Sequence, residues 1–435
     1  MKQRPRLPPG PYLVVGLARS GIAAARMLAA RGRVVGVDSG TPTLESIDGV
    51  ELHVGTDGLE HLDGIATVVK SPGVPAGAPV IAAARERGLS VVGELELAWR
   101  LLPNRFVAVT GTNGKTTTVE LLGEILRAAG EPVVVAGNVG TPLASLVDQL
   151  DPATTVVCEV SSFQLEDGLL FAPEVAVLLN LEPDHLDRHG TFEAYRDAKL
   201  RIFAHQTGDD WAVVPAGFEP VGRARVRTFG GSDEASDGGA VRAGGAEIAV
   251  SEIRLRGEHN VANARAAAEA ALALGIDGHH VVSALRTFAG VPNRLEEVAS
   301  RSGVLYVNDS KATNTAAAAV GIEAFGGGVH AILGGSLKGG DFNALREPVR
   351  SRCRAGYLIG EAGDRLARDL EGTVPLHRCG DLARALAAAA GAATAGDVVL
   401  LSPACASYDH YTDYEERGRH FRELVQALPR TGDSA

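Results

Sequence analysis

The sequence predicts an α/β fold in which helices cover parallel sheets and the chain is divided into three domains. The chain has 435 residues, which is too long for one ordinary hydrophobic core. The same pattern occurs three times, beginning at Tyr12, Phe106 and Val304: a strand, then a glycine-rich or polar turn, then a helix. Hydrophobic residues make up 45% of the chain and charged residues 22%, as is typical of a folded, soluble protein. We expect domains at residues 1–95, 96–291 and 292–435.

Charge and cysteine content argue against several classes of function. The formal charge of −11 does not suit a polyanionic partner, because nucleic-acid binding requires a basic face. The four cysteines are far apart and form no C-x-x-C pair, so neither a zinc knuckle nor a disulfide framework is expected. No uninterrupted apolar run reaches the roughly 18 residues that a membrane helix needs. We expect a cytoplasmic protein, a monomer, that binds neither nucleic acid nor membranes.

The first strand–turn–helix repeat predicts a Rossmann-like domain. Strands are expected at Tyr12–Gly16 and Val34–Val37, with an alanine-rich helix at Ile22–Arg31 between them. Together these elements form one βαβ unit that ends at Asp38.

The turn Gly16-Leu-Ala-Arg-Ser-Gly21 is similar to a dinucleotide-binding fingerprint, with Asp38 about twenty residues further on. Ala18 replaces the middle glycine, however, and its methyl group would crowd a pyrophosphate. An NAD-dependent dehydrogenase is therefore kept as the weaker alternative.

The second repeat carries the segment TGTNGKTTT at residues 110–118, which predicts a central P-loop ATPase-like domain. A glycine-rich turn before a helix directs several N–H groups at one anion, and the helix dipole favours the same charge. Lys115 adds a positive charge, and the Thr116 hydroxyl can bind Mg²⁺. Val109 stands where the usual motif has glycine, so the loop is a shortened variant; a plain threonine-capped turn is the alternative. The loop residues predicted to bind ATP or GTP are Gly111, Thr112, Asn113, Gly114, Lys115, Thr116 and Thr117.

Candidate metal ligands follow two other strands of the central domain. Glu159 ends the strand that begins at Thr155 and is the first Mg²⁺ candidate after Thr116, although it could be an ordinary strand-end acid. His185 and His189 are four residues apart, a spacing that also suits zinc on a helix. Pro183 breaks regular structure there and no third ligand is evident, so a histidine near the triphosphate metal is the preferred interpretation.

The third repeat predicts a second Rossmann-like domain. A strand at Val304–Val307 is followed by the polar turn at 308–314, a helix to about Phe325 and a strand at His330–Leu333. Alanine-rich runs predict helices at 262–274 and 382–395, and the stretch Gly230–Gly245 predicts a surface loop or hairpin.

Eight short segments together resemble the muramoyl ligase family. The segments NDSKATN and SPACAS are the most specific of them, because related ligases share the phosphate loop. The similarity covers nearly the whole chain, and within the family it is greatest to ligases that use UDP-N-acetylmuramoyl-L-alanine and D-glutamate. The eight segments are TGTNGKTTT, GNVGTP (137–142), EVSSFQLE (159–166), PDHLDRHG (183–190), YRDAKLRIF (195–203), EHNVANARAA (258–267), NDSKATN (308–314) and SPACASYDHYTDYEERG (402–418).

The resemblance implies ATP-dependent amide ligation through an acyl phosphate, in the synthesis of a peptidoglycan precursor. It assigns the UDP-sugar to the first domain, ATP to the second and the amino acid to the third. It also implies two Mg²⁺ ions and a Lys199 that is carbamylated by CO₂. A related Mur or folylpolyglutamate-type ligase with another amino acid, and a non-catalytic nucleotide switch, stay as alternatives.

The resemblance also implies a role for individual residues. The catalytic residues would be Lys115, Glu159, His185 and Lys199. The metal ligands would be Thr116, Glu159, His185 and Lys199. Further contacts to ATP would come from Asn260, Arg294 and Asp309. The UDP-substrate would lie against Arg19, Ser20, Asp38, Ser39, Ser71, Gly73, Asn138, Ser161 and Gln164. D-Glutamate would be bound by Thr313, Lys338, Ser407 and Tyr414. Two positions depart from the family: Gly40 replaces a frequent arginine near the uracil, and Tyr414 replaces phenylalanine.

Overall fold

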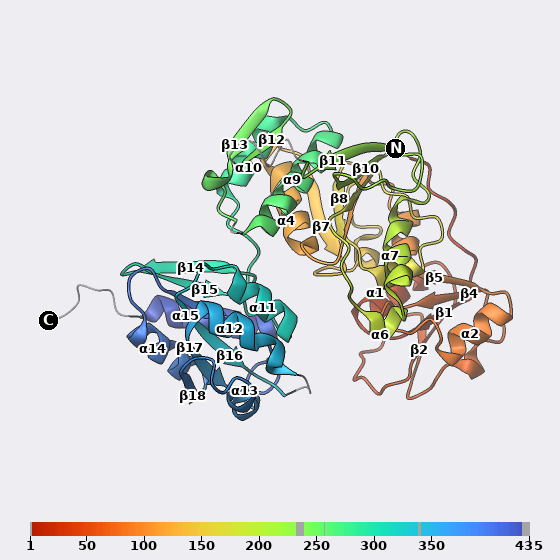
Figure 1. Ribbon diagram of the computed structural model, residues 1–435. Coiled ribbons are helices and arrows are strands. Elements are labelled where there is room, and N and C mark those ends of the chain that lie inside the picture. The colour runs from red at the N-terminus through yellow and green to blue at the C-terminus, as the bar shows by residue number, and fades with distance from the viewer. Residues whose placement is uncertain (1, 232–238, 256, 338–340, 429–435) are drawn as a thin grey trace. The chain divides into compact units, whose positions relative to one another are not determined.

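The computed structural model describes residues 2–231, 239–255, 257–337 and 341–428. The chain forms two compact units (Figure 1). The first comprises the described residues up to Arg254 together with Glu258–Phe288, and the second comprises Leu255, Gly257 and the described residues from Ala289 onward. The first unit contains two sheets with a hairpin, and the second contains one sheet.

The amino-terminal sheet has five parallel strands in the order β3-β2-β1-β4-β5. Its strands β1 and β4 are buried along their whole length, as expected when helices cover both faces. The strand order reverses between β1 and β4, and α/β proteins bind ligands at the carboxyl ends of strands at such a point. The elements are β1 (Tyr12–Val15), α1 (Arg19–Ala29), β2 (Val34–Asp38), β3 (Val50–Val54), β4 (Thr67–Lys70), α2 (Pro79–Glu86), β5 (Ser90–Gly93) and α3 (Glu94–Leu101).

The central sheet has six parallel strands in the order β11-β10-β9-β6-β8-β7. The middle strand β6 pairs Thr110 with Leu178 of β9 and Val109 with Glu159 of β8. The carboxyl ends of these three strands therefore meet at one edge. The elements are β6 (Phe106–Thr110), α4 (Lys115–Ala128), β7 (Val133–Gly137), η2 (Leu143–Leu146), β8 (Thr155–Glu159), α5 (Ser162–Glu166), β9 (Val175–Leu178), α6 (Leu186–His189), α7 (Phe192–Leu200), β10 (Trp211–Pro215) and β11 (Arg225–Phe229).

A hairpin and two helices complete the first unit. Strands β12 (Ala240–Ala243) and β13 (Ala246–Ala249) pair antiparallel, and α9 (Glu258–Ala273) and α10 (Gly278–Thr287) contact α4. One continuous apolar core includes Leu28 of α1, Leu97 of α3 and Phe106 of β6. The amino-terminal and central sheets thus share a core.

The sheet of the second unit has six strands in the order β14-β15-β19-β16-β17-β18, all parallel except the β14–β15 pair. The carboxyl ends of β15 and β19 are neighbours, since Asn308 pairs with Leu401. The elements are β14 (Glu296–Arg301), β15 (Val304–Asn308), α11 (Thr315–Glu323), β16 (Val329–Gly334), α12 (Arg346–Arg352), β17 (Cys353–Ile359), α13 (Gly363–Asp369), β18 (Leu376–Gly380), α14 (Leu382–Ala392), β19 (Val398–Leu401) and α15 (Tyr414–Ala427).

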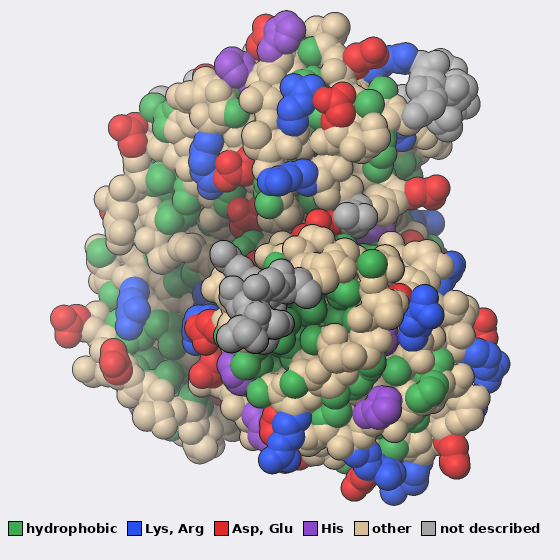
Figure 2. All heavy atoms as spheres, turned by 90° about the vertical axis from the view of Figure 1, so that its left-hand side faces the viewer, with side chains coloured by type: hydrophobic (Ala, Val, Ile, Leu, Met, Phe, Trp, Pro, Cys, Tyr) green, Lys and Arg blue, Asp and Glu red, His purple; other side chains and the backbone are tan. Residues whose placement is uncertain are grey.

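The structure confirms the three predicted strand–turn–helix repeats and the two alanine-rich helices. The predicted boundary between residues 95 and 96 falls inside α3, and the second unit begins at Ala289, three residues before the predicted 292. On the face shown in Figure 2, basic and acidic side chains are interspersed. Within the described ranges, every helix is too short or too polar to span a bilayer.

Candidate nucleotide and substrate site

The turn between β6 and α4 has the backbone geometry of an anion site. Gly111 and Gly114 adopt φ angles of 156° and 83°, which favour glycine. Helix α4 is 14 residues long, and no side chain caps its N-terminus. The N–H groups of its first turn lack acceptors within the helix, so a negatively charged ligand would satisfy them.

Gly114 lies directly against Asn263 of α9. A Cβ atom on Gly114 would lie 2.2 Å from Oδ1 of Asn263, whose side chain is buried. Nδ2 of Asn263 in turn donates to Oδ1 of Asn260, the predicted ATP contact, at 3.2 Å. Asn263 escaped the sequence prediction although it lies in the same EHNVANARAA segment as Asn260.

Two lysines converge on the turn. Nζ of Lys115 donates to the carbonyl oxygens of Gly111 and Thr112 at 2.9 and 2.8 Å. Nζ of Lys199, from α7, donates to the carbonyl oxygen of Gly111 at 2.7 Å. Burial, followed by the repulsion of Lys115, lowers the pKa of Lys199 to about 7. The neutral form of Lys199 is therefore favoured relative to that of an exposed lysine.

Thr116 and Glu159 form the polar pair beneath the turn. The Thr116 hydroxyl donates to Oε2 of Glu159 at 2.7 Å, and Nδ2 of Asn138 donates to Oε1 at 2.9 Å. A carboxylate and a hydroxyl at the mouth of a phosphate turn suit Mg²⁺, so these residues fit one such ion. Across residues 2–231, 239–255, 257–337 and 341–428, no three His, Cys, Asp or Glu side chains converge as metal ligands.

His185 lies on the segment that follows β9. It has a φ of 51° and precedes α6, and its half-exposed imidazole is 3.5 Å from the Asp184 carboxylate. Its ring centroid is 6.3 Å from that of Tyr195, whose hydroxyl donates to Oγ1 of Thr112 at 3.0 Å. Tyr195 thus links the His185 segment to the phosphate turn.

A cavity of about 370 Å³ lies at the strand-order reversal of the amino-terminal sheet. It is lined by seven of the nine predicted UDP-substrate residues: Arg19, Ser20, Asp38, Ser71, Gly73, Asn138 and Gln164. Asn138 follows β7 and Gln164 lies in α5, both in the central domain, so the cavity spans both domains of the first unit. Ser39 does not line it, and Ser161 caps α5 through the amide of Gln164.

Asp38 and Ser71 hold the cavity's backbone in place. The Asp38 carboxylate accepts from the amides of Leu17 and Gly40 at 2.7 and 2.8 Å. The Ser71 hydroxyl donates to the carbonyl oxygen of Gly16 at 2.6 Å. The turns after β1, β2 and β4 are therefore tied together around the cavity.

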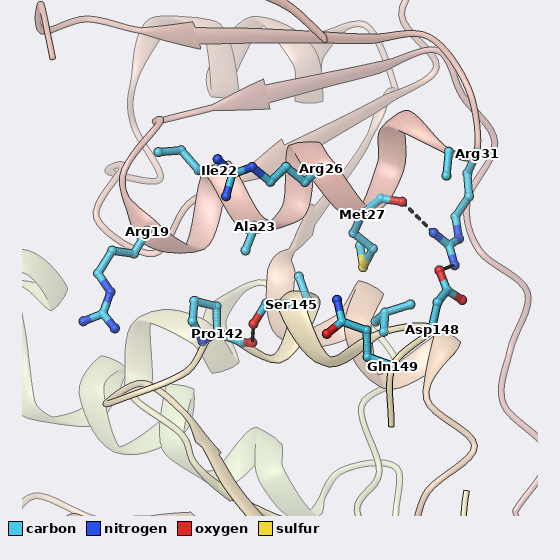
Figure 3. Close-up of a pocket in the computed structure, with 13 residues that line it drawn as sticks. Arg19, Ile22, Ala23, Arg26, Met27, Arg31, Pro142, Ser145, Asp148 and Gln149 are labelled. Carbon is cyan, nitrogen blue, oxygen red and sulfur yellow. Dashed lines mark hydrogen bonds and ion pairs between the residues drawn. The ribbon is translucent and has the colours of Figure 1, made fainter. Parts of the chain in front are cut away.

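A second cavity of about 630 Å³ lies between α1 and the segment at 142–149 (Figure 3). Ile22, Ala23 and Met27 form much of its apolar wall. An ion pair of 2.6 Å between Arg31 and Asp148 lies at one end, and Arg19 lies at the other. Arg19 lines both cavities and donates to the carbonyl oxygen of Gly140 at 2.6 Å.

In the second unit, the predicted ATP contact Asp309 follows β15 and lies beside the end of β19. Asp309 is buried, and it accepts from the Ser402 hydroxyl at 2.7 Å and from the amide of Leu295 at 3.2 Å. Burial raises the pKa of Asp309 to about 7. Arg294 precedes Leu295 and is near enough to lower that pKa partly.

Arg417 connects the two segments that are predicted to bind the amino-acid substrate. The sequence analysis did not single it out. Its side chain is fully buried and donates from Nε to the Ser310 hydroxyl at 2.9 Å and from Nη1 to the Cys405 carbonyl at 3.1 Å. The Ser310 hydroxyl donates to the carbonyl of Tyr414 at 2.8 Å. The NDSKATN and SPACAS segments are thus held side by side.

Three of the four residues predicted to bind D-glutamate lie among the described residues. Ser407 is buried beside the segment held by Arg417, and Thr313 lies in the turn after β15. Tyr414 begins α15, and burial raises the pKa of its hydroxyl to about 12. Lys338 lies outside the described residues.

Comparison with known proteins identifies the family. Three family models match in succession: "Mur ligase MurD-like, N-terminal domain" at residues 11–93, "Mur ligase middle domain" at 109–271 and "Mur ligase, glutamate ligase domain" at 293–405. A protein of Acidobacterium capsulatum named UDP-N-acetylmuramoylalanine–D-glutamate ligase is 44% identical, over 95% of this chain and 96% of the relative. The chain belongs to the Mur ligase family. It has the three-domain architecture of Mur ligases, with a central ATPase-like domain between two Rossmann-like domains.

Further Mur ligases agree in sequence or in fold. A protein of the same name from Koribacter versatilis is 40% identical, over 96% of this chain and 97% of the relative. Among solved structures, the UDP-N-acetylmuramate-alanine ligase MurC of Thermotoga maritima matches with a TM-score of 0.57 at 19% identity, over 96% of this chain and 99% of that one. This structural similarity concerns the fold alone.

Proposed function

We propose that this Mur ligase joins D-glutamate to UDP-N-acetylmuramoyl-L-alanine at the expense of ATP, as a step of peptidoglycan precursor synthesis. The observation that carries the proposal is the arrangement at the phosphate turn, residues 111–117. The Thr116 hydroxyl lies 2.7 Å from Oε2 of Glu159. Asn138 donates to the same carboxylate and also lines the neighbouring cavity. The names of relatives 40–44% identical over nearly the whole chain support the choice of substrates.

Activation of the acid is the first chemical requirement. A carboxylate does not condense with an amine at neutral pH, because the leaving group would be hydroxide. Attack of the substrate's alanine carboxylate on the γ-phosphorus of ATP expels ADP and gives an acyl phosphate. Two anions approach one another in this step, so Lys115 and the amides of the turn would stabilise the developing charge.

The residues around the phosphate turn would bind the metal ions. Thr116 and Glu159 would hold one Mg²⁺, and Mg²⁺ when bound neutralises phosphate charge. A second ion would need a further anion, which carbamylation of Lys199 would supply, and His185 would be another ligand. Formation of a carbamate requires a neutral amine, and the lowered pKa of Lys199 provides one.

Amide formation completes the reaction. The amine of D-glutamate attacks the acyl carbon, a tetrahedral intermediate forms, and inorganic phosphate leaves. The second unit would bind the dicarboxylate through Lys338, Thr313 and Ser407, with Tyr414 beside them. Asn260, Arg294 and Asp309 would contact ATP.

Phosphate release tests this proposal directly. Purified protein with ATP, Mg²⁺ and UDP-N-acetylmuramoyl-L-alanine is assayed with D-glutamate, L-glutamate or meso-diaminopimelate. We expect release with D-glutamate and little with the other two. Equal release with all three, or release that needs no UDP-substrate, would contradict the assignment.

A further inference from the structure

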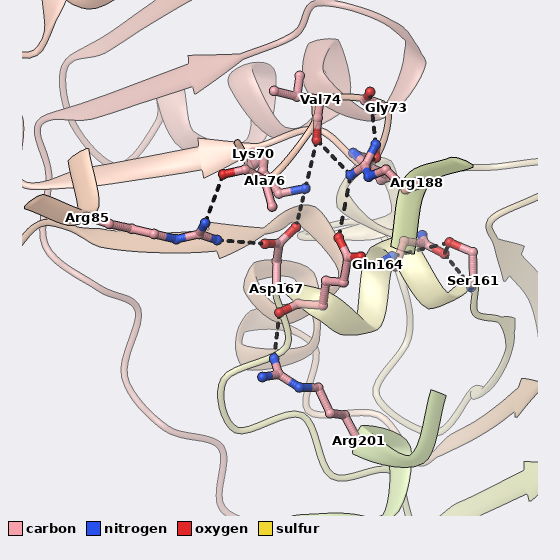
Figure 4. A network of polar contacts seen from close by, with 12 residues as sticks. Lys70, Gly73, Val74, Ala76, Arg85, Ser161, Gln164, Asp167, Arg188 and Arg201 are labelled. Atoms are coloured by element: carbon pink, nitrogen blue, oxygen red, sulfur yellow. Dashed lines mark hydrogen bonds and ion pairs between the residues drawn. The ribbon is translucent and has the colours of Figure 1, made fainter. Parts of the chain in front are cut away.

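Three successive carbonyl oxygens of the turn after β4 face one guanidinium group. Nη2 of Arg188 donates to the carbonyls of Pro72 and Val74 at 3.3 and 2.8 Å, and Nη1 donates to that of Gly73 at 3.3 Å (Figure 4). The turn lies in the amino-terminal domain and lines the 370 Å³ cavity, whereas Arg188 belongs to α6 of the central domain. One side chain thus fixes the orientation of three peptide groups across the domain boundary.

Arg188 is itself held firmly. Its guanidinium lies over the ring of Phe163 at 4.8 Å and is 3.5 Å from the Glu166 carboxylate. Its side chain is only 16% exposed. It lies three residues after His185, so the segment that contains this predicted metal ligand also binds the turn at Pro72–Val74.

A buried ion pair supports the turn from a second side. Lys70 and Asp167 are fully or almost fully buried and lie 2.7 Å apart. Nζ of Lys70 also donates to the Val74 carbonyl at 3.1 Å, so this oxygen accepts from both Lys70 and Arg188. Burial raises the pKa of Asp167, and Lys70 opposes that rise.

The orientation of these carbonyls determines where the amides point. In a trans peptide the N–H of one residue is directed opposite to the carbonyl of the residue before it. The Gly73 N–H is therefore directed away from Arg188. The Val74 amide is already used by the Ser71 carbonyl at 3.0 Å, and a Cβ on Gly73 would meet no heavy atom within 4 Å.

We propose that Arg188 is a positioning residue that holds the turn at Pro72–Val74 in the shape that receives the sugar nucleotide. It has no role in binding ATP. This inference deepens the proposed function and depends on it. A guanidinium suits the task because its rigid fork can serve several acceptors, whereas an ammonium is a point charge with a different geometry.

Direct binding measurements separate this role from a general structural one. Titration calorimetry is carried out with UDP-N-acetylmuramoyl-L-alanine alone and with a hydrolysis-resistant ATP analogue alone, on wild type, R188A and R188K. We expect R188A to weaken binding of the UDP-substrate about tenfold or more. R188K should fall between R188A and wild type, and the Kd of the ATP analogue should change by less than about twofold in each.

The control variant is R201A. Nη1 of Arg201 donates to the carbonyl of Glu166 at 2.6 Å, so this arginine contacts α5 without reaching the turn. R201A should bind both ligands as wild type does. Unchanged UDP-substrate binding in R188A, or equal loss of both ligands with a lower melting temperature, would overturn the inference. Failure of the wild type to bind the UDP-substrate would instead overturn the proposed function.

Discussion

Lys115 and Lys199 share one hydrogen-bond acceptor, the carbonyl oxygen of Gly111, at 2.9 and 2.7 Å. Lys199 is removed from water, which disfavours its charged form, and the neighbouring ammonium group of Lys115 repels it as well. The proton is therefore held less tightly on Lys199, whose pKa falls to about 7. Lys199 thus releases its proton more readily than an exposed lysine does, and its neutral amine is available as a nucleophile.

The variant Lys199→Ala tests the role of this amine. Loss of the amine removes the proposed carbamate, and we expect ligation to fall about a hundredfold or more. Short carboxylates such as acetate should partly restore phosphate release, because they can occupy the vacated anion position. Lys115→Ala assayed with the same carboxylates is the control. No rescue of Lys199→Ala at any carboxylate concentration would argue against the carbamate.

The variant Lys115→Ala tests the cation. Removal of the charge from the phosphate turn should abolish ligation, with a decrease in kcat of roughly a hundredfold or more. Binding of UDP-N-acetylmuramoyl-L-alanine, measured by calorimetry, should stay within about twofold of wild type because Lys115 does not line the cavity. Joint loss of ligation and UDP-substrate binding would show that the two sites are not separate.

The variant Gly114→Ala tests the close contact with α9. The new methyl group would clash with buried Asn263, so the phosphate turn should shift and the melting temperature and ATP affinity should fall. Gly130→Ala is a matched control, because Gly130 follows the same helix at a φ of 73° with open space around its Cβ position. We expect Gly114→Ala to cost about 1–3 kcal/mol more than Gly130→Ala in chemical unfolding. Equal losses of unfolding free energy in the two variants would mean that the Asn263 side chain moves aside without strain.

The variant Glu94→Gln tests a pH-dependent stability. Burial raises the pKa of Glu94 from 4.5 to about 7, against the hydrogen bond of 2.6 Å that it accepts from the Ala144 amide. The folded state therefore holds this proton more tightly than the unfolded state, so stability is lost as pH rises from 4.5 to about 7. A glutamine keeps the acceptor without ionising.

Urea unfolding across this range measures the effect. Between pH 4.5 and about 8, the free energy of unfolding of Glu94→Gln should rise by about 3 kcal/mol relative to wild type. A difference that does not vary with pH would mean that Glu94 does not titrate in this range.

The sequence predicted local features well and long-range contacts poorly. Glycine spacing and strand ends are local patterns, so the glycine-rich turn and the strand that ends at Glu159 could be predicted from the sequence. Parallel pairing of β6 with β8 then brings Glu159 beside the turn. Arg188 was missed because its acceptors lie 114–116 residues away. Arg417 was missed for the same reason, since Ser310 is 107 residues distant. The boundary predicted between residues 95 and 96 lies inside α3, whose Leu97 packs into the core that the amino-terminal and central sheets share.

The pair Lys70–Asp167 has a consequence for the timing of catalysis. The pair is buried, and the amino-terminal and central domains also share one apolar core, so separation of the two domains would break the pair and expose that core to water. The spacing between the 370 Å³ cavity and the turn between β6 and α4 is thus set when the chain folds. Acid and phosphoryl donor would meet in a preorganised frame, and part of the entropic cost of bringing them together would already have been met before either ligand arrives.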